Sequence, residues 1–160
     1  MISIMFVCHG NICRSPMAEF VFKDMVKKQV PEADFLIASA ATSTEEIWNG
    51  VGNPVYPPAR QELQRHGLSC AGKRACLLRK EDYQKYDFLL GMEQRNIANM
   101  MRILKSDPEG KVRRLLDFSE HPRDIADPWY TGEFGKTYED ILEGCEAFLQ
   151  YLKKTGLLWS

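Results

Sequence analysis

The sequence predicts a three-layer α/β fold, in which a four-stranded parallel twisted sheet is flanked by helices. Short apolar runs alternate along the chain with segments whose apolar residues recur at helical spacing. This order is typical of parallel sheets with right-handed crossovers. The chain has 160 residues, of which 44% are hydrophobic and 27% charged. That size and composition predict a single domain over residues 1–160 with a real core.

The first predicted strand covers residues 2–7, and a tight corner connects it to a helix. The run ISIMFV is short, apolar and rich in β-branched residues, as expected for a strand buried on both faces. Beyond the corner, Ser15 is a good N-cap and Pro16 suits the first helical position. Helical spacing then relates the apolar residues Met17, Ala18, Val21, Phe22, Met25 and Val26.

The same patterns predict the remaining elements. Strands are expected over residues 34–40, 86–92 and 111–118. A loop rich in Gly, Asn and Pro covers 43–58, and a short helix then ends near Gly67. Another helix is expected over 93–104. The last helix has a long apolar stripe, with Thr137 as its cap and Gly156 as its stop.

Composition excludes several classes of protein. A net charge of −1 with scattered basic residues argues against a nucleic-acid partner. The N-terminal apolar run is too short for a membrane span or a signal peptide. Five cysteines without paired spacing indicate reduced thiols rather than a disulfide scaffold or a zinc site. We therefore expect a cytoplasmic protein with no membrane partner. A monomer is our working expectation, although composition does not determine the oligomeric state.

The corner after the first strand has the features of a phosphate-binding loop. In parallel sheets the ligand site lies beyond the carboxyl ends of the strands, where Cys8 is expected. The five residues between Cys8 and Arg14 allow a ring of backbone N–H donors, and the following helix points its positive end at the same place. That field favours a thiolate at Cys8 as a nucleophile. The guanidinium of Arg14 suits two phosphate oxygens.

The other residues of the corner have supporting roles in this interpretation. Gly10 allows close approach of the backbone, and Asn11 tolerates the left-handed conformation of such a nest. The Ser15 hydroxyl can cap the helix, donate to the thiolate, or do both. The phosphate-binding set is expected to comprise His9, Gly10, Asn11, Ile12, Cys13 and Ser15, although an outward, solvated ring is the plainer expectation for His9.

The segment VCHGNICRSP resembles the low-molecular-weight protein tyrosine phosphatases, and the likeness continues through ASAATS, GNPVYPPA, KEDYQKYDFLLGM and DPWYTGEF. The resemblance implies a metal-independent hydrolase without a cofactor, acting on phosphotyrosine proteins or aryl phosphates and releasing inorganic phosphate. It makes Cys8 the nucleophile, Arg14 the phosphate-binding residue and Asp127 the general acid. Pro128 biases Asp127 toward an extended backbone. Cys13 is expected to trap oxidised Cys8 as a disulfide, against the alternative of simple packing.

Aromatic residues are expected to form the walls of the substrate site. Trp129 and Tyr130 follow the acid and suit a phosphotyrosine ring, and Trp48 is the candidate for the opposite rim. The family often has an aromatic residue at the place of Glu45, and about four extra residues precede GNPVYPP. Where many members have a histidine in the network under the loop, this chain has Lys73.

Three alternatives to a tyrosine phosphatase stay open. Protein-arginine phosphatases of this scaffold tend to have threonine in place of Ile12 and lack the double aromatic. Arsenate reductases need two further redox cysteines just past the third strand. A phosphate-recognising binding module would use the same loop without turnover. His66 is expected to end a helix, and Cys70, Cys76 and Cys145 are expected to be structural.

Overall fold

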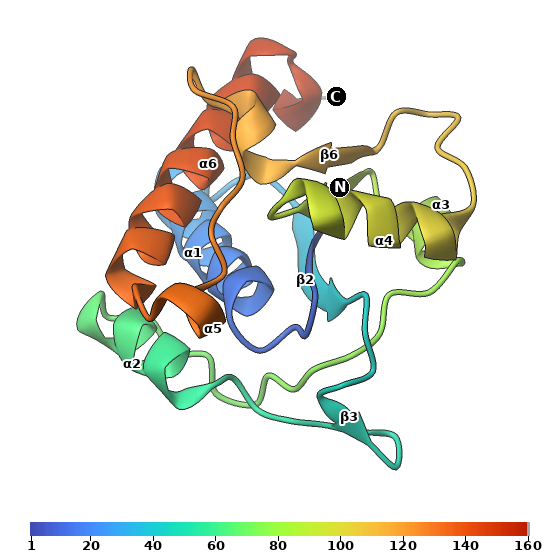
Figure 1. Ribbon diagram of the computed structural model, residues 1–160. Helices are drawn as coiled ribbons and strands as arrows, with labels where there is room; N and C mark the ends of the chain where they lie inside the picture. The colour runs from blue at the N-terminus through green and yellow to red at the C-terminus, as the bar shows by residue number, and fades with distance from the viewer. Residues whose placement is uncertain (160) are drawn as a thin grey trace.

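A four-stranded parallel sheet forms the centre of the computed structural model, which describes residues 1–159 (Figure 1). The order is β2-β1-β5-β6, with bounds Ile2–Cys8 for β1, Phe35–Ala41 for β2, Phe88–Gly91 for β5 and Val112–Arg114 for β6. All three pairings are parallel. This confirms the predicted sheet and brings Cys8 to its carboxyl edge.

Helices cover both faces of the sheet (Figure 1). The helices α1 (Arg14–Gln29) and α6 (Phe134–Lys154) pack on one face, and α3 (Asp82–Lys85) and α4 (Gln94–Leu104) pack on the other. Side chains of β1 alternate between the two cores. Ile4 and Phe6 belong to the first, whereas Met5 and Val7 belong to the second. Burial of both faces explains why the apolar run of this strand does not alternate.

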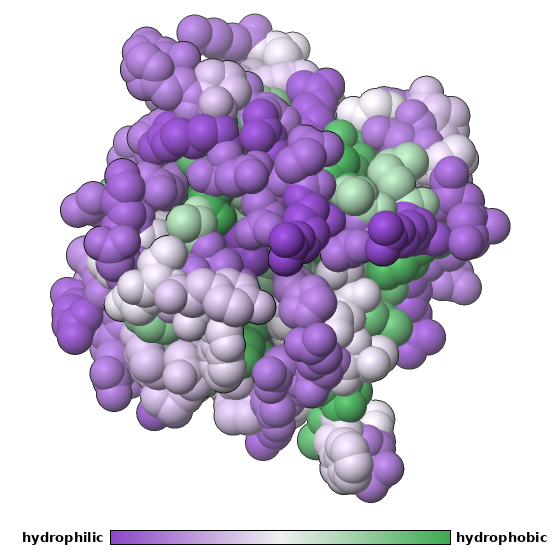
Figure 2. Space-filling model, in the orientation of Figure 1, coloured by the Kyte–Doolittle hydropathy of each residue, from purple (hydrophilic) through white to green (hydrophobic). Residues whose placement is uncertain are grey.

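The segment expected as a loop over 43–58 contains a small antiparallel hairpin. Its strands are β3 (Ile47–Trp48) and β4 (Val51–Gly52). Asn49 and Gly50 form the turn with φ of 50° and 77°, the left-handed conformation that a two-residue hairpin turn requires. The hairpin projects from the body of the protein and carries exposed apolar surface (Figure 2).

The remaining elements are short and connect the layers. They are α2 (Pro57–Arg65), α5 (Pro128–Thr131) and 3-10 helices at Leu115–Phe118 and Leu157–Trp159. Gly67 and Gly156 follow α2 and α6 with positive φ of 76° and 73°, so both predicted helix stops are confirmed. None of the helices within residues 1–159 has the length and apolar character needed to cross a bilayer.

Three expected boundaries were wrong. The fourth strand stops at Arg114, because Leu115 and Leu116 turn into a 3-10 helix and are fully buried. The last helix begins at Phe134, and Thr137 lies inside it. Ser15 is not an N-cap, because α1 already begins at Arg14. Its hydroxyl is instead directed at Cys8.

Candidate active site

The loop between β1 and α1 is held open by its neighbours. The carbonyl groups of Cys8 and His9 accept hydrogen bonds from the amides of Thr42 and Ser43, each at 3.0 Å, and the carbonyl of Ile12 accepts from the amide of Tyr56 at 2.9 Å. These carbonyls therefore point away from the centre of the loop. The amide of Ser15 is directed at Cys8 Sγ at 3.4 Å, and such a loop before a helix N-terminus suits an anion.

Asn11 connects the loop to the structure beneath it. It has φ of 60°, which confirms the predicted left-handed conformation. Its Nδ2 donates to Ser15 Oγ at 2.8 Å and to Ser39 Oγ at 3.0 Å, and its Oδ1 accepts from the amide of Cys76 at 3.1 Å. The side chain is buried, so these bonds are shielded from water and fix the loop.

A buried carboxylate anchors the other end of this network. Glu19 Oε1 accepts from Ser39 Oγ at 2.6 Å, and its Oε2 accepts from Lys23 Nζ at 2.6 Å. Lys73 Nζ donates to the carbonyl of Ser39 at 2.9 Å and lies 3.7 Å from Glu19 Oε1. Lys73 thus occupies the network where many members of the family have histidine. Two ammonium groups compensate Glu19, because an unpaired buried charge is costly.

The nucleophile candidate sits at the base of the loop. Cys8 is buried, and its Sγ lies 3.0 Å from Ser15 Oγ and accepts from the amide of Ser15 at 3.4 Å. Of the two roles considered for the Ser15 hydroxyl, contact with the thiol is therefore the one observed. The Ser15 amide, together with the N-terminus of α1, favours a negative charge on sulfur.

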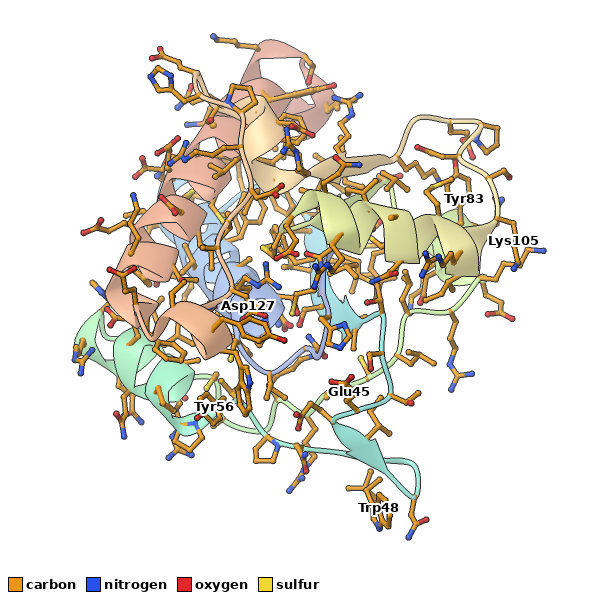
Figure 3. All side chains as sticks on the ribbon, viewed as in Figure 1. Glu45, Trp48, Tyr56, Tyr83, Lys105 and Asp127 are labelled. Atoms are coloured by element: carbon orange, nitrogen blue, oxygen red, sulfur yellow. The ribbon has the colours of Figure 1, made fainter. Side chains whose placement is uncertain are left out.

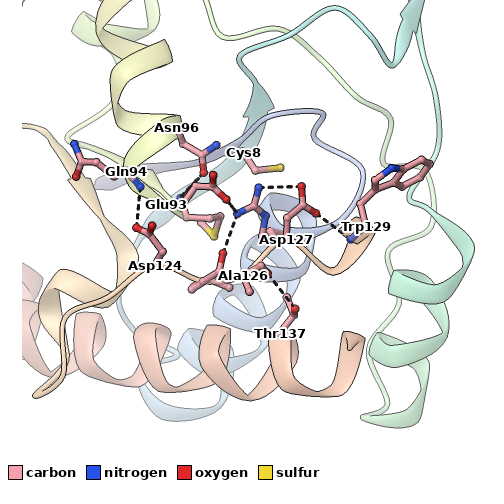
Figure 4. A network of polar contacts seen from close by, with 12 residues as sticks. Cys8, Glu93, Gln94, Asn96, Asp124, Ala126, Asp127, Trp129 and Thr137 are labelled. Atoms are coloured by element: carbon pink, nitrogen blue, oxygen red, sulfur yellow. Dashed lines mark hydrogen bonds and ion pairs between the residues drawn. The ribbon is translucent and has the colours of Figure 1, made fainter. Parts of the chain in front are cut away.

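Arg14 is held between two carboxylates under the pocket. Its Nη1 donates to Glu93 and to the carbonyl of Ile125, the latter at 2.9 Å, and its Nη2 lies 3.4 Å from Asp127 Oδ2 (Figure 4). Burial opposes the charge of Arg14, but the negative charges of Cys8, Asp127 and Glu93 outweigh it and raise the pKa of Arg14. The guanidinium is therefore fixed in charge and orientation.

Sequence reasoning missed Glu93 and Glu19. Glu93 precedes α4 as its N-cap, and Asn96 Oδ1 accepts from the amide of Glu93 at 3.0 Å. A signal was present for both, because Glu93 directly follows the run predicted as the third strand and Glu19 borders the apolar stripe of α1. Neither pattern predicts the partner, which is Arg14 for Glu93 and Ser39 for Glu19.

The general acid candidate lies on the loop before α5. Asp127 has φ of −77° and ψ of 114°, the extended backbone expected before Pro128, and its Oδ1 accepts from the amide of Trp129 at 3.0 Å. The Trp129 ring packs on Tyr56, with centroids 4.9 Å apart. Trp129 and Tyr130 remain 55% and 80% exposed, and both line the pocket, where they are accessible to a ligand.

The pocket encloses about 140 Å³ at the carboxyl edge of the sheet. Its lining brings together the loop, the acid candidate and the aromatic pair: Cys8, His9, Gly10, Ile12, Cys13, Arg14, Glu45, Glu46, Asp127, Trp129 and Tyr130. Asn11 and Ser15 support the loop from beneath and do not line the pocket. Within residues 1–159, no group of three or more His, Cys, Asp or Glu side chains is arranged to hold a metal ion.

The expectation for Trp48 was wrong. It is 79% exposed on the projecting hairpin and does not line the pocket (Figure 3). Trp48 lies on β3 of the hairpin, which projects from the body of the protein (Figure 3), and Glu45 and Glu46 line the pocket instead. His9 lines the entrance, and its Nε2 lies 3.0 Å from Glu45 Oε2.

The other cysteines and His66 lie in different environments. Burial, with added repulsion from Cys8 and Asp127, raises the pKa of Cys13, which shares the pocket with Cys8. Cys70 and Cys145 are buried, but Cys76 is exposed, and its amide supports Asn11. His66 follows α2 as predicted and stacks on Tyr138 with centroids 3.7 Å apart.

Fold and site together define a class of protein. A parallel α/β sheet delivers a thiol into the loop before a helix N-terminus, with a buried arginine and a carboxylate in the same pocket, and this arrangement suits phosphoryl transfer through cysteine. The chain belongs to the low molecular weight phosphotyrosine protein phosphatase family, whose model matches residues 3–157.

Individual relatives cover nearly the whole chain. The low molecular weight protein-tyrosine-phosphatase YfkJ of Bacillus subtilis is 35% identical over 96% of this chain and 97% of its own length, and its crystal structure covers 97% and 96% with a TM-score of 0.88. The low molecular weight phosphotyrosine protein phosphatase of Gallus gallus is 36% identical over 92% of this chain and 94% of its own length. The crystal structure of a drosophila arginine phosphatase matches 94% of this chain and 97% of its own chain with a TM-score of 0.83, and the two sequences are 29% identical.

Proposed function

We propose that this chain is a protein tyrosine phosphatase that hydrolyses phosphotyrosine in proteins, or aryl phosphates, through a cysteinyl-phosphate intermediate. The observation that carries the proposal is the position of Cys8 Sγ, which accepts from the amide of Ser15 at 3.4 Å inside the loop that Arg14 closes. The names of the relatives support the choice of phosphotyrosine.

Each residue has a defined part in the proposed reaction. The Cys8 thiolate attacks phosphorus, so that an S–P bond forms while the bond from phosphorus to the phenolic oxygen breaks. Asp127 gives its proton to that oxygen. In the second step the Asp127 carboxylate takes a proton from water as the water attacks phosphorus, and Cys8 leaves as a thiolate with inorganic phosphate as product. Arg14 binds the phosphoryl oxygens in both steps.

The direct test is to trap the intermediate. The wild-type protein is mixed with a phosphotyrosine peptide, quenched rapidly and digested, and the phosphorylated residue is located by mass spectrometry. We expect the phosphoryl group on Cys8. A phosphoryl group on another side chain, or turnover without any phosphorylated enzyme, would contradict the proposed route.

Hydrolysis of phosphoarginine is the specific alternative, because the drosophila arginine phosphatase has a similar structure. Ile12 lines the pocket, where arginine phosphatases of this scaffold tend to have threonine, and Trp129 and Tyr130 lie beside it. Both features favour a tyrosine substrate. Arsenate reduction is disfavoured because residues 92–101 contain no cysteine. Hydrolysis of phosphotyrosine and phosphoarginine peptides, measured beside thioredoxin-coupled arsenate reduction, separates the three activities. A dominant rate in either alternative assay overturns our choice.

Glu93→Gln is expected to weaken the site without unfolding it. Gln retains the shape of the side chain but loses the charge that orients Arg14. A hydrogen bond between charged groups contributes about 1.5–3 kcal/mol, so kcat/KM is expected to fall roughly tenfold to a hundredfold. Steady-state kinetics measure the effect, and Glu109→Gln at an exposed position is the matched control. Equal kinetics of both variants would remove Glu93 from this role.

We further propose that Cys13 protects Cys8 from irreversible oxidation. Peroxide converts the Cys8 thiolate to a sulfenic acid, and the Cys13 thiol then displaces water to form a disulfide, which cellular thiols reduce. The shared pocket of the two residues supports this. Mass spectrometry after peroxide treatment is expected to find a Cys8–Cys13 link. Cys13→Ser is expected to accumulate sulfinic Cys8, and the same product in the wild type would contradict the proposal.

The proposed enzyme is a cytoplasmic monomer with one phosphatase domain over residues 1–160. All five cysteines are free thiols, which suits a reducing compartment. A solution mass near 18.4 kDa by light scattering is the expected result, and twice that mass would contradict a monomer.

A further inference from the structure

The mouth of the pocket carries an excess of negative charge. Among the side chains that line it, the carboxylates are Glu45, Glu46 and Asp127, whereas the basic side chains are Arg14 and His9. Arg14 is already paired with Asp127 and Glu93 at the base. The rim formed by Glu45 and Glu46 therefore has His9 as its nearest compensating group among the lining residues.

Glu46 is held in place over the phosphate-binding loop. Asn53 Nδ2 donates to its Oε2 at 2.7 Å, and the amide of Asn53 donates to its carbonyl at 2.8 Å. A Cβ atom added at Gly10 would lie 3.3 Å from Glu46 Cγ, so this side chain packs directly on the loop. Its side-chain partner is a neutral amide, and the negative charge is therefore left for a ligand.

Glu45 stands further out on the same rim. Its side chain is 68% exposed, and its Oε2 lies 3.0 Å from His9 Nε2. Its amide donates to Ser43 Oγ at 3.1 Å, which fixes the backbone at the start of the segment that leads to the hairpin. In Figure 3, Glu45 lies between Asp127 and Trp48, which is on the projecting hairpin.

We infer that Glu45 and Glu46 select phosphotyrosine substrates with lysine or arginine next to the phosphotyrosine, and disfavour those with acidic neighbours. The inference rests on the proposed function, because a phosphotyrosine ring in this pocket places the flanking polypeptide at its mouth. Opposite charges attract there, whereas carboxylates of the substrate are repelled. Exposed pairs are weak, so each favourable contact is expected to change kcat/KM only about twofold to fivefold.

The test compares three phosphotyrosine peptides that differ only in the two flanking residues, which are lysine, glutamine or glutamate. For each enzyme, kcat/KM is divided by its value for p-nitrophenyl phosphate, which has no flanking residues. The wild type is expected to rank lysine over glutamine over glutamate, with about tenfold between the extremes at low salt and less at high salt. Glu45→Gln combined with Glu46→Gln is expected to reduce this spread to about twofold or less.

The control variant changes net charge by the same amount elsewhere. Glu120→Gln combined with Glu146→Gln alters exposed residues outside the pocket and is expected to retain the wild-type ranking. An unchanged ranking in the Glu45 and Glu46 variant, or a wild type that prefers glutamate, would overturn the inference while leaving the proposed function standing. Absence of turnover on every peptide and on p-nitrophenyl phosphate would overturn both.

Discussion

Cys8→Ser is expected to abolish hydrolysis and to leave binding of phosphate intact. The thiol lies at the base of the loop, where the amide of Ser15 and the N-terminus of α1 favour a negative charge on sulfur. A serine hydroxyl is not ionised at neutral pH, so the nucleophile is lost while the amides and Arg14 remain. The expected fall in kcat is roughly 10⁵-fold or more. Hydrolysis of p-nitrophenyl phosphate measures the loss, and calorimetry with inorganic phosphate measures the binding.

Cys70→Ser is the matched control for this variant. It makes the same change at a buried thiol that does not line the pocket, and it is expected to retain activity. Thermal unfolding shows whether either protein is damaged. Turnover by Cys8→Ser within a factor of about ten of the wild type would exclude Cys8 as the nucleophile. A wild type that binds phosphate without turnover would instead identify a binding module.

Asp127→Ala is expected to slow the reaction according to the leaving group. Phenols of high pKa need a proton as the bond to phosphorus breaks, and general acid catalysis contributes about 10²–10⁴-fold. A good leaving group such as p-nitrophenolate needs less help, so its kcat is expected to fall much less. A series of aryl phosphates that differ in leaving-group pKa measures this difference. Equal losses across the series would remove Asp127 from the acid role.

The variant Asp127→Asn distinguishes the role of Asp127 in proton transfer from its role in contacts with its neighbours. The aspartate also accepts from the amide of Trp129 and pairs with Arg14, and alanine removes both contacts together with the acid. Asparagine retains an acceptor for Trp129 but has no acidic proton. The same dependence on leaving group in both variants is the expected result. Wild-type rates in Asp127→Asn would mean that the contacts, rather than the proton, matter.

Local patterns were enough to predict the strand, the loop and the helix around Cys8. The burial of β1 on both faces follows from its apolar run. Cys8 and Arg14 are six residues apart in sequence, so the loop between β1 and α1 is enough to bring them to the same site. The left-handed Asn11 was predicted for the same reason, because it reflects the conformational preference of one residue. The two roles left open for the Ser15 hydroxyl have the same sequence pattern, and the folded structure shows the contact with Cys8 rather than the N-cap.

Contacts between segments far apart in the sequence could not be predicted from local sequence patterns. Asp127 was found through resemblance to a family, since nothing near it in the sequence relates it to Arg14. Glu93 was missed, although it contacts Arg14 from the end of another strand. Trp48 was assigned to the rim because it is aromatic and near the site in sequence. Its actual place on a projecting hairpin (Figure 3) depends on the pairing of β3 with β4.

Short-range periodicity and backbone preference were enough to predict the parallel sheet, the phosphate-binding loop after the first strand, and the thiol and arginine within it. The carboxylates that hold Arg14, the support of Asn11 by Lys73 and Glu19, and the side chains at the mouth of the pocket could be identified only in the folded protein. Those contacts join segments that are dozens of residues apart, and packing of the sheet and helices alone brings them within bonding distance.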